Sequence, residues 1–173
     1  MKVSVYIACS VDGFIARQNG DLDWLPQEPT EDGEDYGYQE FISSIDCMLM
    51  GFNTYKKLLE FDEWPYDIPV VVMTSTKMAE IPGRARFTSA TPLEVYRDLE
   101  SRGLKRIYLD GGLLIQSFLQ ENLVDDLIIT TIPVLIGQGR PLFGNLKQDK
   151  KLAHLKTQSF SSGMVQTHYR IQR

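Results

Sequence analysis

RIYLDGGLLIQSFL (residues 106–119) reads as a short apolar strand, two glycines and a helix with apolar residues on one face. Gly111 and Gly112 leave bare backbone where the strand ends and the helix begins. The free N–H groups of the first helical turn and the positive end of the helix dipole favour an anion there, typically a phosphate. A plain tight turn from strand to helix explains the glycine pair equally well, so the rest of the chain has to decide.

The composition argues against several classes of protein. The chain has 173 residues, which suits one domain over residues 1–173 with a substantial core. Its net charge of −5 argues against a nucleic-acid surface, because such a surface needs a basic stripe to displace counterions. No apolar run approaches the ~18 residues of a membrane span. A strand that starts at Lys2 leaves no space for a signal peptide, so we expect a cytoplasmic protein.

The cysteines and histidines give no sign of a disulfide or a metal. Cys9 and Cys47 both lie in apolar, strand-like runs, which predicts buried free thiols. His154 and His168 lack a ligand-like spacing, so the sequence predicts no metal site.

Strands and helices alternate along the chain before two final strands. We expect strands at residues 2–8, 46–50, 69–73, 106–110, 126–135, 153–160 and 164–170. Helices are expected at 35–44, after Asn53 or Thr54 as N-cap, after the Thr91 cap and after Gly111. This order predicts an α/β fold, a mixed sheet with helices on both faces and a C-terminal antiparallel hairpin.

Three unusual junctions follow predicted strands, at residues 51–54, 74–77 and 110–113. Ligands of open α/β sheets lie beyond the carboxyl ends of parallel strands. If the three strands are parallel neighbours, the junctions line one crevice that suits a dinucleotide. The usual Gly-x-Gly-x-x-Gly fingerprint after the first strand is absent.

Six segments carry a family resemblance through their order and spacing: ACSVDGFIA (8–16), DLDWL (21–25), IDCMLMGFNTY (45–55), LDGG (109–112), LVDDL (123–127) and PVLIGQGRPLF (133–143). Together they resemble the dihydrofolate reductase-like superfamily, and more closely the reductase domain of bacterial riboflavin biosynthesis, the RibD C-terminal domain family. The resemblance spans nearly the whole chain. It implies a dihydrofolate reductase-like three-layer mixed sheet with NADPH bound across the carboxyl edge.

The resemblance also implies cofactor-binding positions. Gly111 and Gly112 match the glycines that face the cofactor phosphates, with a cis peptide bond between them, and Leu113 and Leu114 continue that helix start. The other matching positions are Gly51, Asn53 and Thr54 at a second phosphate-binding helix start, Thr74 and Ser75 near the 2′-phosphate, and Ala8 and Ile15 beside the nicotinamide.

Phe52 is a departure from the family pattern. Relatives usually carry an arginine after the glycine that matches Gly51, where it holds the adenosine 2′-phosphate. A charge-assisted pair is then missing. Lys77 or Lys56 is the expected substitute, and NADPH remains favoured over NADH.

Two carboxylates are candidates for the catalytic acid. Asp12 matches a segment of the riboflavin-pathway reductases, but it also suits a turn in which its side chain bonds nearby backbone. Glu28 echoes the buried carboxylate of dihydrofolate reductases, although it stands one residue too close to the tryptophan and among other acids. The residues expected to shape the substrate side are Trp24, Tyr36, Phe52 and Thr130.

These observations predict an NADPH-dependent reductase that transfers a hydride to a small planar, carbonyl or imine compound. It would resemble 5-amino-6-(5-phosphoribosylamino)uracil reductase and dihydrofolate reductase, and pair as a homodimer like its riboflavin-pathway relatives. The alternative is a non-catalytic nucleotide-binding or sensor protein on the same fold, since fold does not fix function. A third possibility is a structural domain without a ligand.

Overall fold

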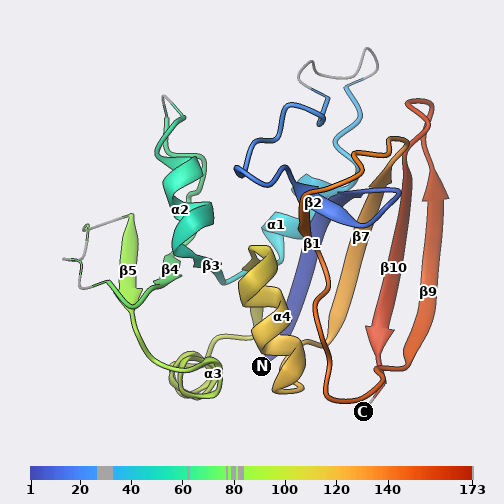
Figure 1. The fold of residues 1–173 in the computed structure, drawn as a ribbon. Helices are drawn as coiled ribbons and strands as arrows, with labels where there is room; N and C mark the ends of the chain where they lie inside the picture. Colours follow the sequence, from blue (N-terminus) through green and yellow to red (C-terminus); the bar gives the residue numbers. More distant parts are fainter. Residues whose placement is uncertain (27–32, 62, 77, 79–80, 82–83, 173) are drawn as a thin grey trace.

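An eight-stranded sheet forms the centre of the computed structural model, which describes residues 1–26, 33–61, 63–76, 78, 81 and 84–172 (Figure 1). Its strands are β1 (Lys2–Ser10), β3 (Cys47–Gly51), β4 (Val70–Met73), β5 (Ala85–Thr88), β6 (Arg106–Asp110), β7 (Asp126–Ile132), β9 (Leu152–Ser159) and β10 (Val165–Ile171). They lie in the order β5-β4-β3-β6-β1-β7-β10-β9. Neighbours are parallel from β5 to β7, and the β7–β10 and β10–β9 pairs are antiparallel.

The helices lie on both faces of this sheet (Figure 1). They are α1 (Tyr38–Ser43), α2 (Phe52–Leu58), α3 (Pro92–Ser101) and α4 (Gly112–Gln120). A separate pair of short strands, β2 (Phe14–Ala16) and β8 (Arg140–Pro141), joins two distant loops beside the sheet. The predicted fold is confirmed: helix, mixed sheet and helix form three layers, and the chain ends in an antiparallel hairpin.

Alternating side chains of the central strands pack into two separate hydrophobic cores, one on each face of the sheet. In β3, Leu49 packs with α3 and α4, whereas Met48 and Met50 pack with α1 and α2. Strands buried on both faces read as continuous apolar runs, and this explains why the strand at Cys47–Gly51 is apolar throughout. The glycine-flanked helix α4 buries Ile115 and Phe118 completely in the first core, as the opening stretch of sequence predicted.

Several predicted boundaries were wrong for local reasons. Helix α2 begins directly at Phe52, and its N-cap is Gly51 in an extended conformation rather than Asn53 or Thr54. Strand β7 ends at Ile132 instead of running to residue 135, because Pro133 has no N–H for the ladder. The edge strand β5 was not predicted at all.

Cys9 and Cys47 are buried free thiols, as predicted. Among the described residues no group of three or more His, Cys, Asp and Glu side chains is placed to hold a metal ion. No helix in that part of the chain is long and apolar enough to cross a membrane.

Candidate functional site

A cavity of about 920 Å³ opens where the parallel strands end. Ala8 of β1, Gly51 of β3, Met73 of β4 and Asp110 of β6 all line it, and each stands at or near the carboxyl end of its strand. Its other walls come from α2, from the first turns of α4, from the segment between residues 15 and 25, and from residues 139–141. The cavity therefore joins segments from most of the chain at the edge where ligands of α/β sheets bind.

Two of the three predicted junctions meet in this cavity. Residues 51–54 and 110–114 both line it, and a Cβ atom on Gly111 would lie 2.7 Å from Thr54 Oγ1. The third junction contributes less: Met73, the last residue of β4, lines the cavity, but Thr74 and Ser75 after it do not. Thr74 Oγ1 accepts a hydrogen bond from the Thr76 N–H in its own turn. Lys77 lies outside the described residues.

The glycine pair has a structural explanation within the chain itself. Gly111 turns the chain with φ +98°, a conformation that side-chain-bearing residues rarely adopt. A Cβ atom on Gly112 would lie 2.6 Å from Ile15 Cδ1. The described residues contain no cis peptide bond, so the predicted cis bond between Gly111 and Gly112 is wrong. A positive φ at Gly111 makes the turn instead.

The first turn of α4 presents backbone N–H groups to the cavity. Gly112, Leu113 and Leu114 line the cavity at the start of the helix, and the first N–H groups of a helix have no acceptor within it. Leu113 remains 76% exposed although it is a large apolar residue. This turn therefore offers donors and an apolar side chain to a ligand.

Asp110 is the carboxylate among the described residues that line the cavity, and sequence reasoning gave it no role. Burial raises the pKa of Asp110 to about 6, and the Gly111 N–H donates to Asp110 Oδ1 at 2.7 Å. Tyr38 and Tyr66 lie nearby, and burial raises the pKa of both phenols. The signal in the sequence was a carboxylate placed directly between a buried strand and the glycine pair.

Of the two predicted catalytic carboxylates, the structure describes one, Asp12, and it is not on this wall. Ser10 Oγ donates to Asp12 Oδ1 at 2.6 Å, and the Gly137 N–H donates to Oδ2 at 2.7 Å. These contacts are those of the turn aspartate that was its alternative role. Glu28 lies outside the described residues.

The residues predicted for the substrate side divide into two groups. Phe52 lines the cavity; Trp24 does not, although its neighbours in the same loop do. Thr130 is the Cα partner of Ala8 on the adjacent strand, and Gln166 Nε2 donates both to Thr130 Oγ1 and to the Tyr36 carbonyl oxygen, each at 3.0 Å. Tyr36 and Thr130 thus belong to a network one strand beyond the cavity.

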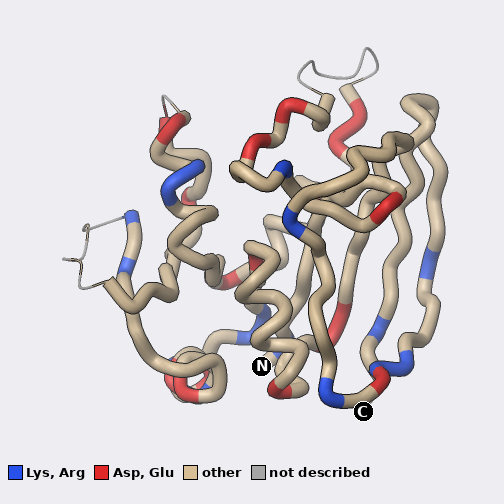
Figure 2. Tube along the Cα trace, viewed as in Figure 1, with Lys and Arg blue, Asp and Glu red and all other residues tan. Residues whose placement is uncertain are grey.

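The cavity is lined by two basic side chains that the sequence did not single out, Lys57 and Arg140. They belong to the basic segments of α2 and of the β2–β8 region in Figure 2. Lys57 Nζ lies 3.1 Å from a Glu60 carboxylate oxygen and 3.6 Å from one of Asp21. Lys56, the expected substitute for the family arginine, instead lies over the Phe52 ring, 5.5 Å from its centroid.

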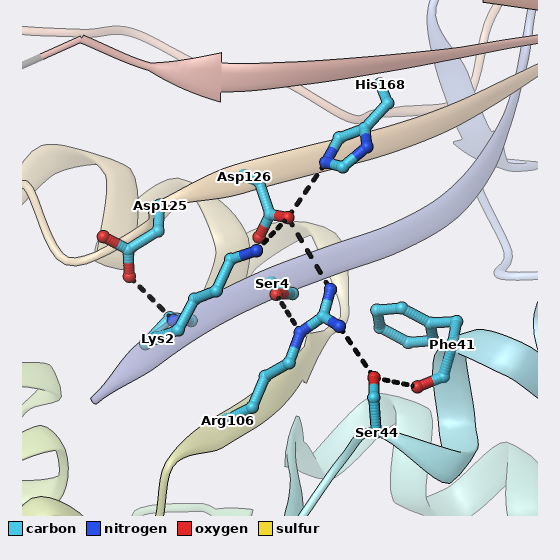
Figure 3. A network of polar contacts seen from close by, with 9 residues as sticks. Lys2, Ser4, Phe41, Ser44, Arg106, Asp125, Asp126 and His168 are labelled. Atoms are coloured by element: carbon cyan, nitrogen blue, oxygen red, sulfur yellow. Dashed lines mark hydrogen bonds and ion pairs between the residues drawn. The ribbon is translucent and has the colours of Figure 1, made fainter. Parts of the chain in front are cut away.

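A second polar cluster lies at the opposite edge, where Lys2, Arg106 and Asp126 begin the parallel strands β1, β6 and β7 (Figure 3). The buried Asp126 carboxylate lies 2.8 Å from Lys2 Nζ, 2.9 Å from His168 Nε2 and 3.6 Å from Arg106 Nη2. Burial acts to raise the pKa of Asp126, but hydrogen bonds from Lys2, Ser4 and His168 outweigh it, and the pKa lies below its usual value. None of these residues lines the cavity, so the cluster belongs to the fold rather than to the candidate site.

The chain is similar to known proteins over its whole length. The family model described as the RibD C-terminal domain matches residues 1–166. An uncharacterized protein of Bacillus subtilis (strain 168), YwjB, is 33% identical over 171 residues, which cover 97% of each chain. A second uncharacterized protein of that organism, YyaP, is 32% identical and covers 97% of this chain and 94% of its own.

The similar solved structures have the same fold. A putative riboflavin biosynthesis protein from Shewanella sp. PV-4 is 36% identical over all of both chains, with a TM-score of 0.93. A diaminohydroxyphosphoribosylaminopyrimidine deaminase/5-amino-6-(5-phosphoribosylamino)uracil reductase from Thermotoga maritima has a TM-score of 0.74 at 17% identity; it covers 99% of this chain, which spans 56% of that one. At that identity the likeness shows the fold alone. The match to the family model over nearly the full length confirms the resemblance seen in the sequence, and the chain belongs to the RibD C-terminal domain family.

Proposed function

We propose that this protein is an NADPH-dependent reductase that transfers a hydride to a small molecule carrying a carbonyl or imine group. One observation carries the proposal: a single cavity at the carboxyl edge of the parallel sheet is lined by the first turn of α4, the start of α2 and Ala8 of β1. Family membership supports the same reading, because this family includes the reductase domain of riboflavin biosynthesis.

The lining residues suit a dinucleotide in both shape and chemistry. Gly112, Leu113 and Leu114 would hold a phosphate through their N–H groups. Ala8 and Ile15 would pack beside the nicotinamide ring, and Asn53 and Thr54 offer polar groups across the cavity. When bound, NADPH would supply the hydride from its nicotinamide ring. The contribution of the chain is to orient the two reactants and exclude water.

Reduction of a carbonyl or imine also needs a proton, and we assign its donation to Asp110. Its carboxyl group is on the cavity wall and, with a pKa of about 6, is partly protonated near neutral pH. Groups with such a pKa serve well as general acids. Asp12 and Glu28 remain the alternatives predicted from the sequence.

The experiment follows NADPH oxidation by absorbance with a panel of pterins, ribitylated pyrimidine precursors and simple carbonyl compounds. We expect turnover with at least one compound, and a loss of roughly 10²–10⁴-fold in kcat for Asp110→Asn if the group is the general acid. Asp12→Asn tests the alternative assignment: its carboxylate accepts from the Gly137 N–H and does not line the cavity, so kcat should be kept, and a loss there but not in Asp110→Asn would assign the role to Asp12. Binding of NADPH without turnover across the panel would favour the sensor protein instead.

We also propose that the chain forms a homodimer, as its riboflavin-pathway resemblance implies. Light scattering after gel filtration should then give twice the mass of one chain. A mass equal to one chain at micromolar concentration would contradict it.

A further inference from the structure

Arg140 is held in one orientation on the cavity wall. It pairs with Ala16 in the small β2–β8 sheet, and its Nε donates to the Gln18 carbonyl oxygen at 3.2 Å. Its Cζ, Nη1 and Nη2 atoms are all 3.3 Å from the position of a Cβ atom on Gly20. Equal distances to these three atoms mean that the guanidinium plane lies flat over Gly20.

Gly20 makes this stacking possible. It is buried and has φ +96°, and any side chain there would press against the guanidinium group. With one face covered and Nε bonded, the two Nη groups are the part of Arg140 left for a ligand. Within the described part of the chain they have no hydrogen-bond or ion-pair partner.

Among the described residues that line the cavity, Arg140 is also the basic residue without an ion-pair partner. Lys57 is paired with Glu60 and Asp21, and Arg17 Nε lies 2.8 Å from Asp23 Oδ1. No described carboxylate lies within ion-pair distance of Arg140. Arg140 is itself exposed, and a cation without a paired carboxylate at the wall of a cavity attracts an anion.

The position of Arg140 ties it to the helix that we expect to bind phosphate. The Pro141 carbonyl oxygen, one residue on, accepts a hydrogen bond from Gln116 Nε2 of α4 at 3.0 Å. A Cβ atom on Gly112 would lie 3.3 Å from that same oxygen. The guanidinium group of Arg140 and the first turn of α4 therefore belong to one connected wall of the cavity.

We propose that Arg140 binds a phosphate group of the ligand that fills the cavity. A guanidinium fork matches two oxygens of a phosphate, and its fixed orientation reduces the entropy lost on binding. Arg140 would then supply the charge missing at Phe52, from the opposite wall. The identity of the ligand as a dinucleotide rests on the proposed function, whereas the phosphate-binding role of Arg140 does not.

Calorimetric titration of the full chain tests this role with three probes: NADPH, NADH and ribose 5-phosphate. Arg140→Gln should weaken binding of the affected probe roughly 10- to 100-fold. Arg140→Lys keeps the charge but loses the fork, and it should show an intermediate loss. Arg17→Gln is the matched control: this neighbouring arginine is already paired and does not line the cavity, so its affinities should match the wild type.

The probes identify the source of the phosphate. If Arg140→Gln loses affinity for NADPH alone, Arg140 binds the 2′-phosphate. If it loses affinity for both dinucleotides, Arg140 binds the diphosphate. If it loses affinity for ribose 5-phosphate, Arg140 binds the phosphate of a substrate. The inference is overturned if Arg140→Gln is folded and binds all three probes as tightly as the wild type. It is also overturned if Arg17→Gln loses as much affinity as Arg140→Gln. If the wild type binds ribose 5-phosphate through Arg140 but neither dinucleotide, the proposed function fails and this inference stands. If it binds no probe, both fail.

Discussion

At the scale of single residues, Asp110 and Asp12 are carboxylates with opposite surroundings. Burial raises the pKa of Asp110, and one backbone N–H only partly offsets it. A hydrogen bond from the Ser10 hydroxyl, with further bonds from backbone N–H groups of the Gly137 turn, lowers the pKa of the exposed Asp12. Asp110 can therefore exchange a proton near neutral pH, whereas Asp12 stays ionised and holds a turn.

Asp110→Asn should stabilise the protein at neutral pH. The folded pKa of about 6 is above the usual value of about 4, so the folded state binds the proton more tightly. The contribution of Asp110 to wild-type stability should then be fully present below about pH 4 and be lost as the pH rises from about 4 to about 6. Because Asp110 is partly accessible from the cavity, we expect its ionisation to lower the free energy of unfolding of the wild type by only roughly 1–2 kcal/mol. Urea unfolding of the wild type and of Asp110→Asn across this pH range measures the difference in free energy of unfolding.

Asn at position 110 cannot ionise, so the free energy of unfolding of Asp110→Asn should lack the decline that begins near pH 4. Asp12→Asn is the control, because the pKa of Asp12 is lowered and its contribution changes in the opposite direction. Equal pH dependence of wild type and Asp110→Asn would contradict the raised pKa.

Asp126→Asn should destabilise the fold through the cluster in Figure 3. The substitution leaves Lys2, Arg106 and His168 around an amide without charge, and removing one member of a buried ion cluster costs several kcal/mol. Since Lys2 is partly exposed, we expect about 2–4 kcal/mol in urea unfolding at pH 7. The pKa of Asp126 is lowered, so the loss should shrink as the pH falls below about 4.

The control for this cluster is Asp149→Asn, which changes an exposed carboxylate and should shift stability by less than about 0.5 kcal/mol. A loss for Asp126→Asn no larger than the control would mean that the cluster contributes nothing measurable. The sequence did not indicate this cluster, because its members come from four strands that only the sheet order brings together.

At the scale of elements, local rules predicted helix ends where a side chain caps them. Thr91 Oγ1 accepts the Glu94 N–H, and the Glu94 carboxylate accepts the Thr91 N–H at 2.8 Å, which is the predicted capping box of α3. Helix α2 has no side-chain cap, because it starts in the residue after β3 ends. Its start was misplaced for that reason: the polar residues that looked like caps lie inside its first turn.

Gly139→Ala should disturb the β2–β8 pair that carries Arg140. A Cβ atom on Gly139 would lie 2.3 Å from the Ala16 carbonyl oxygen, and backbone cannot yield as a side chain can. We expect a loss of roughly 1–3 kcal/mol in unfolding free energy, typical of an overpacked site, and weaker binding of any ligand that uses Arg140.

Gly51→Ala is the matched control for stability, since nothing lies within 4 Å of its Cβ position and its φ of −80° suits alanine. Thermal unfolding of the two variants side by side separates the clash from a general cost of replacing glycine. Equal melting temperatures for both would show that β2 and β8 can move apart freely.

At the scale of the whole molecule, the sequence predicted the layers but not the order of the strands. Alternation of strand and helix, with Gly111 between them, sufficed for the fold class. The placement of β1 between β6 and β7 depends on pairings more than 100 residues apart, for which no local pattern exists. The same limit applied to the site: Gly51 and Gly111 were found from their local motifs, whereas Arg140 became a candidate only when β8 was seen to pair with β2.

This assembly of distant segments predicts that the dinucleotide of the proposed function would raise global stability. The cavity walls come from β1, α2, β6, α4 and the β2–β8 pair, so a bound dinucleotide would hold together parts that separate on unfolding. A ligand at 100 times its Kd adds about 2.7 kcal/mol to the free energy of unfolding. For a chain of this size that corresponds to a rise in Tm of about 5–10 °C. Differential scanning fluorimetry with NADPH measures the rise, and inorganic phosphate at equal ionic strength controls for general anion effects. An equal rise with phosphate would mean that a small anion at the rim, and not a ligand spanning the cavity, stabilises the fold.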